Sequence, residues 1–258
     1  MKFTKALLVL SVALCLHSSA SAAIIVAGID NWDSTTAPTV PVTAAGVTAT
    51  ATASAVGGTE NWSISDGSGR GSSGDTTWGT FDGNGVPASS ETEVGPANFT
   101  LQNARTDGQV TLTIANNGAA DIVLEAFHMD ALAFRPKAAR TYALNVLSGD
   151  ITNGNVFTSD APMNDNSTNA ITHLGGGLSG HDQHDDLDLD LTGLADNVLE
   201  AGGSVVIQIA FSNGVGDGSG GHHLFLDNVA VSGSVVPEPS SLVLLGMMSL
   251  VAVGRKRR

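Results

Sequence analysis

The 258-residue chain is acidic, with 11 Lys and Arg residues against 25 Asp and Glu residues and a formal net charge of −14. Such a surface repels phosphate backbones, which excludes nucleic acid as a partner, and it attracts divalent cations. Hydrophobic residues make up 42% of the chain and charged residues only 14%, so the composition is that of a folded protein and not of a disordered acidic one.

The first 22 residues have the three parts of a secretory signal peptide. Lys2 and Lys5 give a positive start, and the apolar run 6–16 that follows is too short for a permanent transmembrane helix. Ala20-Ser21-Ala22 then has the small-x-small order that signal peptidase accepts. We therefore expect signal peptidase to cleave the chain after Ala22 or Ala23.

Cys15 is the only cysteine and lies within this apolar run. It follows Leu14, whereas the cysteine of a lipoprotein signal follows a small residue, so lipidation is not expected. After cleavage the mature chain contains no cysteine and cannot form disulfides.

Residues 23–235 show a recurring alternation of apolar and polar residues, which predicts β-strands. Clusters of Gly, Asn, Asp and Ser separate the strands as turns do. Clear examples of the alternation are 47–53, 110–114, 142–146, 187–191 and 205–211. We expect roughly ten to twelve strands in a two-sheet antiparallel β-sandwich of jelly-roll type, with helices only in the signal and in a short C-terminal segment.

Trp32, Trp62 and Trp78 are the only tryptophans, and all lie in the N-terminal third. A buried tryptophan closes the end of a sandwich core, whereas an exposed one offers a flat face on which a sugar ring stacks. The core role is the commoner one. Trp62 and Trp78 are nevertheless the candidate ligand-binding residues, and their exposure distinguishes the two roles.

The segment 181–186 combines two histidines with three carboxylates. His181, His184 and Asp185 are therefore candidate metal ligands. A solvated acidic turn is the alternative and is favoured, because no glycine supplies the tight turn of an EF-hand loop.

Asp227 lies in the run 224–231, where apolar residues occupy both alternating positions, which predicts a strand covered on both faces. A carboxylate buried there needs a partner. The segment Leu226-Asp227-Asn228-Val229 resembles the final strand of carbohydrate-binding jelly-roll modules. This resemblance implies that Asp227 helps to hold a structural Ca²⁺, whereas hydrogen bonds from backbone amides are the alternative. No other cofactor is expected.

The C-terminal segment 236–258 has three parts: a proline-flanked glutamate, the apolar run 242–253 and a basic end. The apolar run is shorter than a stable span requires, and the cations would stay on the cytoplasmic side. The candidate sorting residues are Pro237, Glu238, Pro239, Arg255, Lys256, Arg257 and Arg258.

This segment resembles the sorting tail of PEP-CTERM proteins, the substrates of membrane proteases called exosortases. The resemblance implies transient inner-membrane anchoring in a Gram-negative-type bacterium, removal of the tail by exosortase, and a destination at the cell surface or in an exopolysaccharide or biofilm matrix. The residue pattern alone would indicate only a C-terminal membrane anchor.

These features predict an exported, surface or matrix-associated protein with a structural or adhesive role. A calcium-stabilised carbohydrate-binding module is the alternative, and a glycan-processing hydrolase is a more distant one. The sequence has no Gly-x-Ser-x-Gly elbow, His-Glu-x-x-His motif or phosphate-binding glycine loop, so we expect no enzymatic activity.

Overall fold

The computed structural model describes most of the region between the predicted signal and the predicted tail. The predicted signal 1–22, the tail from residue 237 onward, and Trp78, His181 and His184 lie outside the described residues. The described residues are 23–29, 32–56, 62–65, 98–101, 107–134, 139, 141–159, 173–174, 177–178, 185–213 and 223–236. This part of the chain contains no helix long and apolar enough to cross a membrane.

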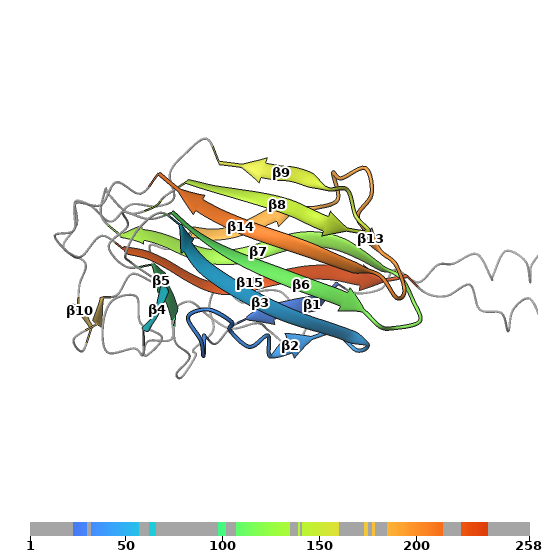
Figure 1. The fold of residues 1–258 in the computed structure, drawn as a ribbon, viewed down its shortest axis with the longest axis horizontal. Coiled ribbons are helices and arrows are strands. Elements are labelled where there is room, and N and C mark those ends of the chain that lie inside the picture. The colour runs from blue at the N-terminus through green and yellow to red at the C-terminus, as the bar shows by residue number, and fades with distance from the viewer. Residues whose placement is uncertain are drawn as a thin grey trace, which may run out of the picture.

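Two antiparallel sheets make up the fold (Figure 1). Sheet A is eight-stranded, with the main order β12 (Asp185–Asp190), β7 (Ile122–Phe134), β15 (His223–Val235), β1 (Ile24–Ile29) and β2 (Val42–Thr43). Its other strands are β4 (Trp62–Ser65), β5 (Asn98–Leu101) and β13 (Val198–Leu199). Sheet B is five-stranded, with the order β3 (Val47–Val56), β6 (Asp107–Asn116), β14 (Ser204–Ser212), β8 (Thr141–Gly149) and β9 (Gly154–Thr158). Strands β10 (His173–Leu174) and β11 (Gly177–Leu178) form a separate pair.

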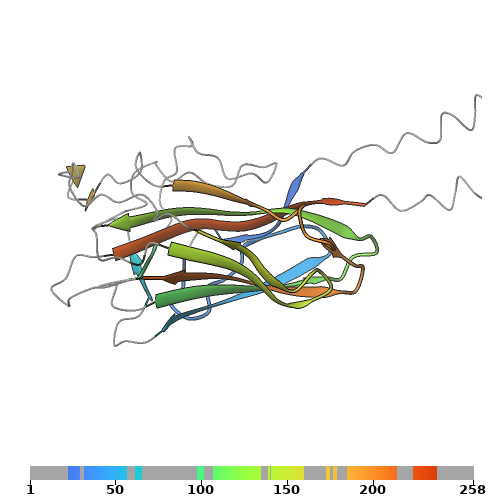
Figure 2. The same cartoon turned by 90° about the horizontal axis from the view of Figure 1, so that it is seen from above.

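The sheets stack as two layers, and the chain passes repeatedly from one to the other (Figure 2). After β5 in sheet A, for example, the chain forms β6 in sheet B, β7 in sheet A and β8 in sheet B. The first strand, β1, pairs with the last, β15. This alternation between layers is that of a jelly roll, so the predicted fold class is confirmed.

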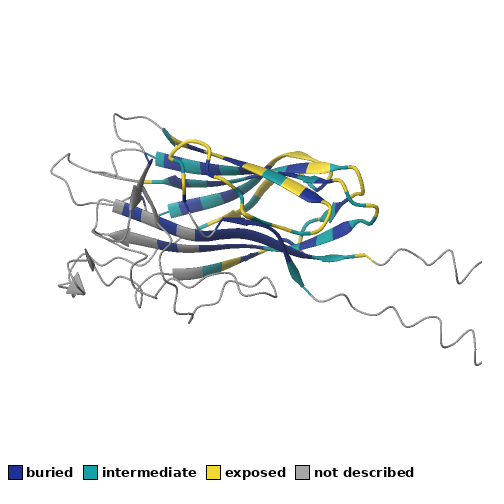
Figure 3. Ribbon diagram, turned by 90° about the horizontal axis from the view of Figure 1, so that it is seen from below, coloured by how far each residue is buried: buried dark blue, intermediate teal, exposed yellow. Residues whose placement is uncertain are grey.

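The predicted alternation accounts for the core. Strand β14 buries Val205, Ile207, Ile209 and Phe211, while the residues between them are half-buried. The same pattern occurs in β6 and β8, and together with the inward residues of sheet A these side chains form one hydrophobic core. Figure 3 shows buried positions on the strands of both layers. Because residues two apart share one face of a strand, one apolar row on each strand is enough to define the interior.

Strand β15 is covered on both faces, as its sequence predicts. Every residue from Asn228 to Gly233 is buried. The strand pairs with β7 on one side and β1 on the other, and its register with β7 shifts between Asp227 and Ala230. Asn228 lies within this shift with a positive φ of 47°, a backbone conformation that asparagine tolerates better than most residues. The central strand of sheet A therefore bends next to the predicted calcium ligand.

Candidate functional site

Trp62 and Trp32 both lie in the core. Trp62 is 3% exposed and Trp32 is 1% exposed. The indole nitrogen Nε1 of Trp62 donates a hydrogen bond to the Ser54 carbonyl oxygen at 3.0 Å. Its ring meets Phe211 edge-on, with 6.2 Å between the ring centroids. Trp62 therefore has the core role that the sequence favours, and its ring offers no surface face to a sugar.

Asp227 occupies a row of three aspartates across three neighbouring strands. In the register of sheet A, Asp227 of β15 lies opposite Asp130 of β7, and Asp130 lies opposite Asp186 of β12. Directly opposed residues on adjacent antiparallel strands have Cβ atoms about 5 Å apart, and like charges in such pairs are destabilising. The backbone register therefore aligns three aspartate positions across β15, β7 and β12.

The sequence pattern singles out Asp227 and includes Asp186 among the three carboxylates of 181–186, but it does not single out Asp130. Asp185, predicted as a ligand, lies opposite Ala131, one position away from the row. Where side chains are described, no group of three or more His, Cys, Asp or Glu residues is placed to hold a metal ion. The case for calcium thus rests on the backbone register of the three aspartates.

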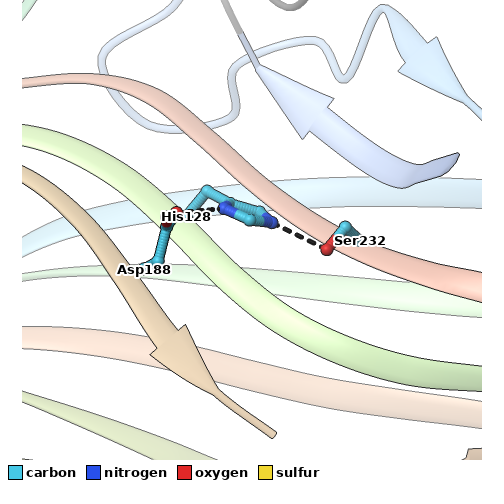
Figure 4. A network of polar contacts seen from close by, with 3 residues as sticks. All are labelled: His128, Asp188 and Ser232. Atoms are coloured by element: carbon cyan, nitrogen blue, oxygen red, sulfur yellow. Dashed lines mark hydrogen bonds and ion pairs between the residues drawn. The ribbon is translucent and has the colours of Figure 1, made fainter. Parts of the chain in front are cut away.

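A second polar group in sheet A connects the same three strands. His128 of β7 lies between Asp188 of β12 and Ser232 of β15 (Figure 4). Its Nδ1 is 2.5 Å from Asp188 Oδ1, and its Nε2 is 2.7 Å from Ser232 Oγ. An ionised carboxylate can only accept, so Nδ1 carries a hydrogen when Asp188 is ionised; in a neutral ring Nε2 then accepts from the serine hydroxyl, and in a protonated ring Nε2 donates to it.

This connectivity is also that of an acyl-transfer triad, in which a carboxylate orients a histidine that activates a serine. Here, however, Ser232 is 4% exposed and His128 is 5% exposed, whereas the Asp188 side chain is 62% exposed. Ser232 also lies inside a strand paired on both sides. A nucleophile needs access to its substrate and donors aimed at the developing oxyanion. The burial favours a structural role, in which the group fixes the register of three strands.

The sequence held a signal for His128 that was not used. In the run 126–134, as in β15, apolar residues occupy both alternating positions. His128 and Asp130 are the polar residues within this run. Like Asp227, these two residues are polar positions in a run that is apolar at both alternating positions, and a polar side chain buried in such a strand needs a partner.

Comparison with known proteins assigns the C-terminus. Residues 235–258 match the model of the PEP-CTERM protein-sorting motif, which confirms the resemblance found in the sequence. The motif indicates export and surface sorting in a Gram-negative bacterium, and it implies processing by exosortase. No curated protein matches the chain in sequence.

Similar solved structures include carbohydrate-binding modules and an adhesin domain. A family 11 carbohydrate-binding module of the cellulosomal cellulase Lic26A-Cel5E of Clostridium thermocellum is 10% identical, with a TM-score of 0.32 over 84% of this chain and 96% of the module. The CBM51 module of Clostridium perfringens GH95, solved with methyl-galactose, is 11% identical, with a TM-score of 0.27 over 69% of this chain and 92% of the module. The K1 cleaved adhesin domain of Lys-gingipain from Porphyromonas gingivalis is 13% identical, with a TM-score of 0.28 over 71% of this chain and 97% of that domain. These values describe a distant likeness of all-β structures.

The chain is thus a β-sandwich protein of jelly-roll type that ends in a PEP-CTERM sorting motif.

Proposed function

We propose that this protein is a structural or adhesive component of the cell surface or of an exopolysaccharide matrix. The observation that carries the proposal is the sorting motif at residues 235–258, which directly follows the last strand of the sandwich. A signal peptidase would remove the first 22 residues, and the tail would hold the chain briefly in the inner membrane until exosortase cuts near Glu238. The acidic sandwich would then be released or attached outside the cell.

Changing the proline-flanked glutamate tests this route. In the producing bacterium, the triple variant Pro237→Ala, Glu238→Ala, Pro239→Ala is expected to accumulate in the membrane fraction with its tail intact, because exosortase no longer recognises it. The wild-type chain should appear in the surface or matrix fraction without its tail. Cell fractionation combined with mass spectrometry of the intact protein measures both results.

The double variant Ser240→Ala, Ser241→Ala is the matched control, because it changes two neighbouring residues of the same segment, keeps the proline-flanked glutamate and should be sorted normally. A wild-type surface product that still carries Arg258 would contradict the proposed route.

The aspartate row favours a second candidate function, that of a calcium-stabilised carbohydrate-binding module. Calcium prefers carboxylate oxygens and takes several of them at once. In this proposal Asp227, Asp130 and Asp186 would contribute ligands, and the ion would remove the repulsion that their register creates. Its role would be to stabilise the bent centre of sheet A, with no part in chemistry.

Removing calcium tests the proposed ion. At a calcium concentration of about 100 times Kd, binding stabilises the folded state by roughly 2.7 kcal/mol. We therefore expect a chelator to lower the melting temperature of the full chain by roughly 5–10 °C. Differential scanning calorimetry with added calcium and with chelator measures the shift.

Two variants sharpen the test. Asp130→Asn should lose the response to calcium, yet without calcium it should melt no lower than the wild type, because it also removes a repelling charge. Asp150→Asn, at an exposed turn residue outside the row, should respond to calcium like the wild type. A wild-type melting temperature that does not change with chelator would remove the structural ion.

A further inference from the structure

The outward face of sheet B is nearly free of charge, although the chain carries a net charge of −14. We use the name neutral face for the residues that project outward from its strands between the inward, buried rows. They include Thr48, Thr50, Thr52 and Ser54 from β3, Gln109, Thr111 and Thr113 from β6, Ser204 and Gln208 from β14, Thr141 and Asn145 from β8, and Asn155 from β9. Of the described residues in these rows, Asp107 at the start of β6 is the only one with an ionisable side chain.

The neutral face is most open to solvent along its β3 edge. Thr50 of β3 and Thr113 of β6 lie directly opposite each other, and both are exposed. Next to them, Thr52 lies opposite Thr111, and Thr111 lies opposite Gln208 of β14. Hydroxyl and amide groups therefore follow one another from strand to strand across the sheet.

Hydrogen bonds between strands hold the longer side chains of the neutral face in place. Nε2 of Gln109 donates to Ser54 Oγ at 3.0 Å, and Nε2 of Gln208 donates to Thr111 Oγ1 at 3.3 Å. At the opposite edge of the sheet, Nδ2 of Asn155 donates to Asn145 Oδ1 at 3.0 Å. The amides of Gln109 and Gln208 each carry a second N–H and an acceptor oxygen, whereas Asn155 Nδ2 also lies within hydrogen-bonding distance of the Leu144 and Phe157 carbonyl oxygens. A partner would therefore meet groups that are already ordered, which lowers the entropic cost of binding.

The chemistry of the neutral face selects the kind of partner. The described strands of sheet B expose two large apolar side chains, Leu147 of β8 and, at the edge strand β9, Phe157, which stacks on Tyr142 with 5.7 Å between the ring centroids. The remaining described residues that project outward include no aromatic, Met or Arg side chain. These types dominate the centres of protein–protein interfaces, whereas Ser and Thr are poor anchors there. A charged polymer would find almost no ion-pairing group. An uncharged polymer rich in hydroxyl groups would instead find donors and acceptors repeated about every 4.8 Å across the strands and about every 6.8 Å along them.

The negative charge outside the neutral face also disfavours an acidic polymer as the partner. Exposed carboxylates lie on sheet A, at Asp188 and Asp190 of its edge strand β12. An acidic polysaccharide approaching the chain would be repelled by its overall charge unless cations intervened. The neutral face is a broad surface on which a neutral chain can lie without losing solvation of charged groups.

We propose that the neutral face binds a neutral, extended polysaccharide of the matrix through its array of hydroxyl and amide groups. This inference rests on the proposed matrix function and names the class of polymer and the surface that meets it.

Affinity electrophoresis of the full-length protein tests the proposal. The gels contain hydroxyethyl cellulose or galactomannan as neutral polymers, or alginate as an acidic one. We expect at least one neutral polymer to retard the wild type, and alginate without calcium to have no effect. The double variant Thr50→Glu, Thr113→Glu places two carboxylates at opposed, exposed positions and should weaken the retardation by about tenfold or more.

Two further variants keep the result interpretable. Thr43→Glu makes the same change at an exposed strand position of sheet A and should bind like the wild type. Thr111→Ala combined with Gln208→Ala removes hydrogen-bonding groups without adding charge, and should also weaken binding while keeping the wild-type melting temperature. The proposal is overturned if no neutral polymer retards the wild type, if only alginate does, or if Thr43→Glu weakens binding as much as the double variant.

Matrix retention in the producing bacterium separates this inference from the proposed function. If the wild type and the Thr50→Glu, Thr113→Glu variant are both retained equally, the matrix role stands and the neutral face is not the binding surface. If neither reaches the matrix, the proposed function itself fails. Retention of the wild type alone supports both.

Discussion

Replacing Asn116 with alanine is expected to lower the free energy of unfolding by about 3 kcal/mol. Asn116 ends β6 and is 1% exposed. Its Nδ2 lies 2.9 Å from the Ala120 carbonyl oxygen, 3.2 Å from that of Leu199 and 3.1 Å from that of Glu200, and its Oδ1 accepts from the Gly118 N–H at 3.0 Å. Alanine would leave these backbone groups without their partner in a place that water reaches poorly, which costs more than the hydrogen bonds contribute. Urea unfolding measures the loss.

Asn117→Ala is the matched control, since it changes the same residue type one position later. Asn117 is exposed, and its Nδ2 donates to Thr48 Oγ1 at 2.9 Å, where water can replace it. We expect a change of about 0.5 kcal/mol or less. If the two variants lost similar stability, the β6–β7 turn and the end of β13 would not depend on the Asn116 side chain.

The strand pattern in the sequence was sufficient to predict the layers of this fold. Where one face of a strand is buried, as in β6 and β14, apolar residues recur at every second position and the prediction follows directly. Strand β15 gave a different signal, with apolar residues at both positions, and it lies at the centre of sheet A with every residue from 228 to 233 buried. The pattern of apolar residues in a strand thus indicates whether one face or both faces of that strand are buried.

Strand order could not be predicted in the same way. Strands β12, β7 and β15 are neighbours in sheet A, yet long stretches of chain separate them in sequence. The aspartate row and the His128 group both depend on this order and on its register. Alternation alone does not reveal register between distant strands, because any two strands with the same pattern can pair in several ways.

The outer surfaces of the two sheets differ in charge. Edge strand β12 of sheet A carries Asp186, Asp188 and Asp190 at alternate positions, and charges on an edge strand discourage pairing with another chain. Sheet B instead presents threonine and amide side chains. The outer surface of sheet A therefore carries charge, whereas that of sheet B offers uncharged hydrogen-bonding groups.

Replacing His128 with leucine is expected to lower the free energy of unfolding by about 2 kcal/mol, mainly because the buried Ser232 hydroxyl loses its hydrogen-bond partner. Asp188 loses its partner too, but its exposed carboxylate returns to water at small cost. Ser232→Ala alone should cost about 1 kcal/mol, since it leaves His128 Nε2 unpaired.

The double variant distinguishes a structural group from a catalytic one. If His128 and Ser232 stabilise the strands through their contact, His128→Leu combined with Ser232→Ala should be less destabilised than the sum of the single variants, because no buried polar partner is left behind. Chemical unfolding of all four proteins gives this coupling energy, which should be about 1 kcal/mol. A catalytic serine predicts a different result: its activated hydroxyl should react with a fluorophosphonate, and His128→Leu should abolish that labelling. Because Ser232 is buried, we expect a coupling energy between the two variants and no labelling of the serine. Additive stability losses together with labelling that depends on His128 would contradict the structural role.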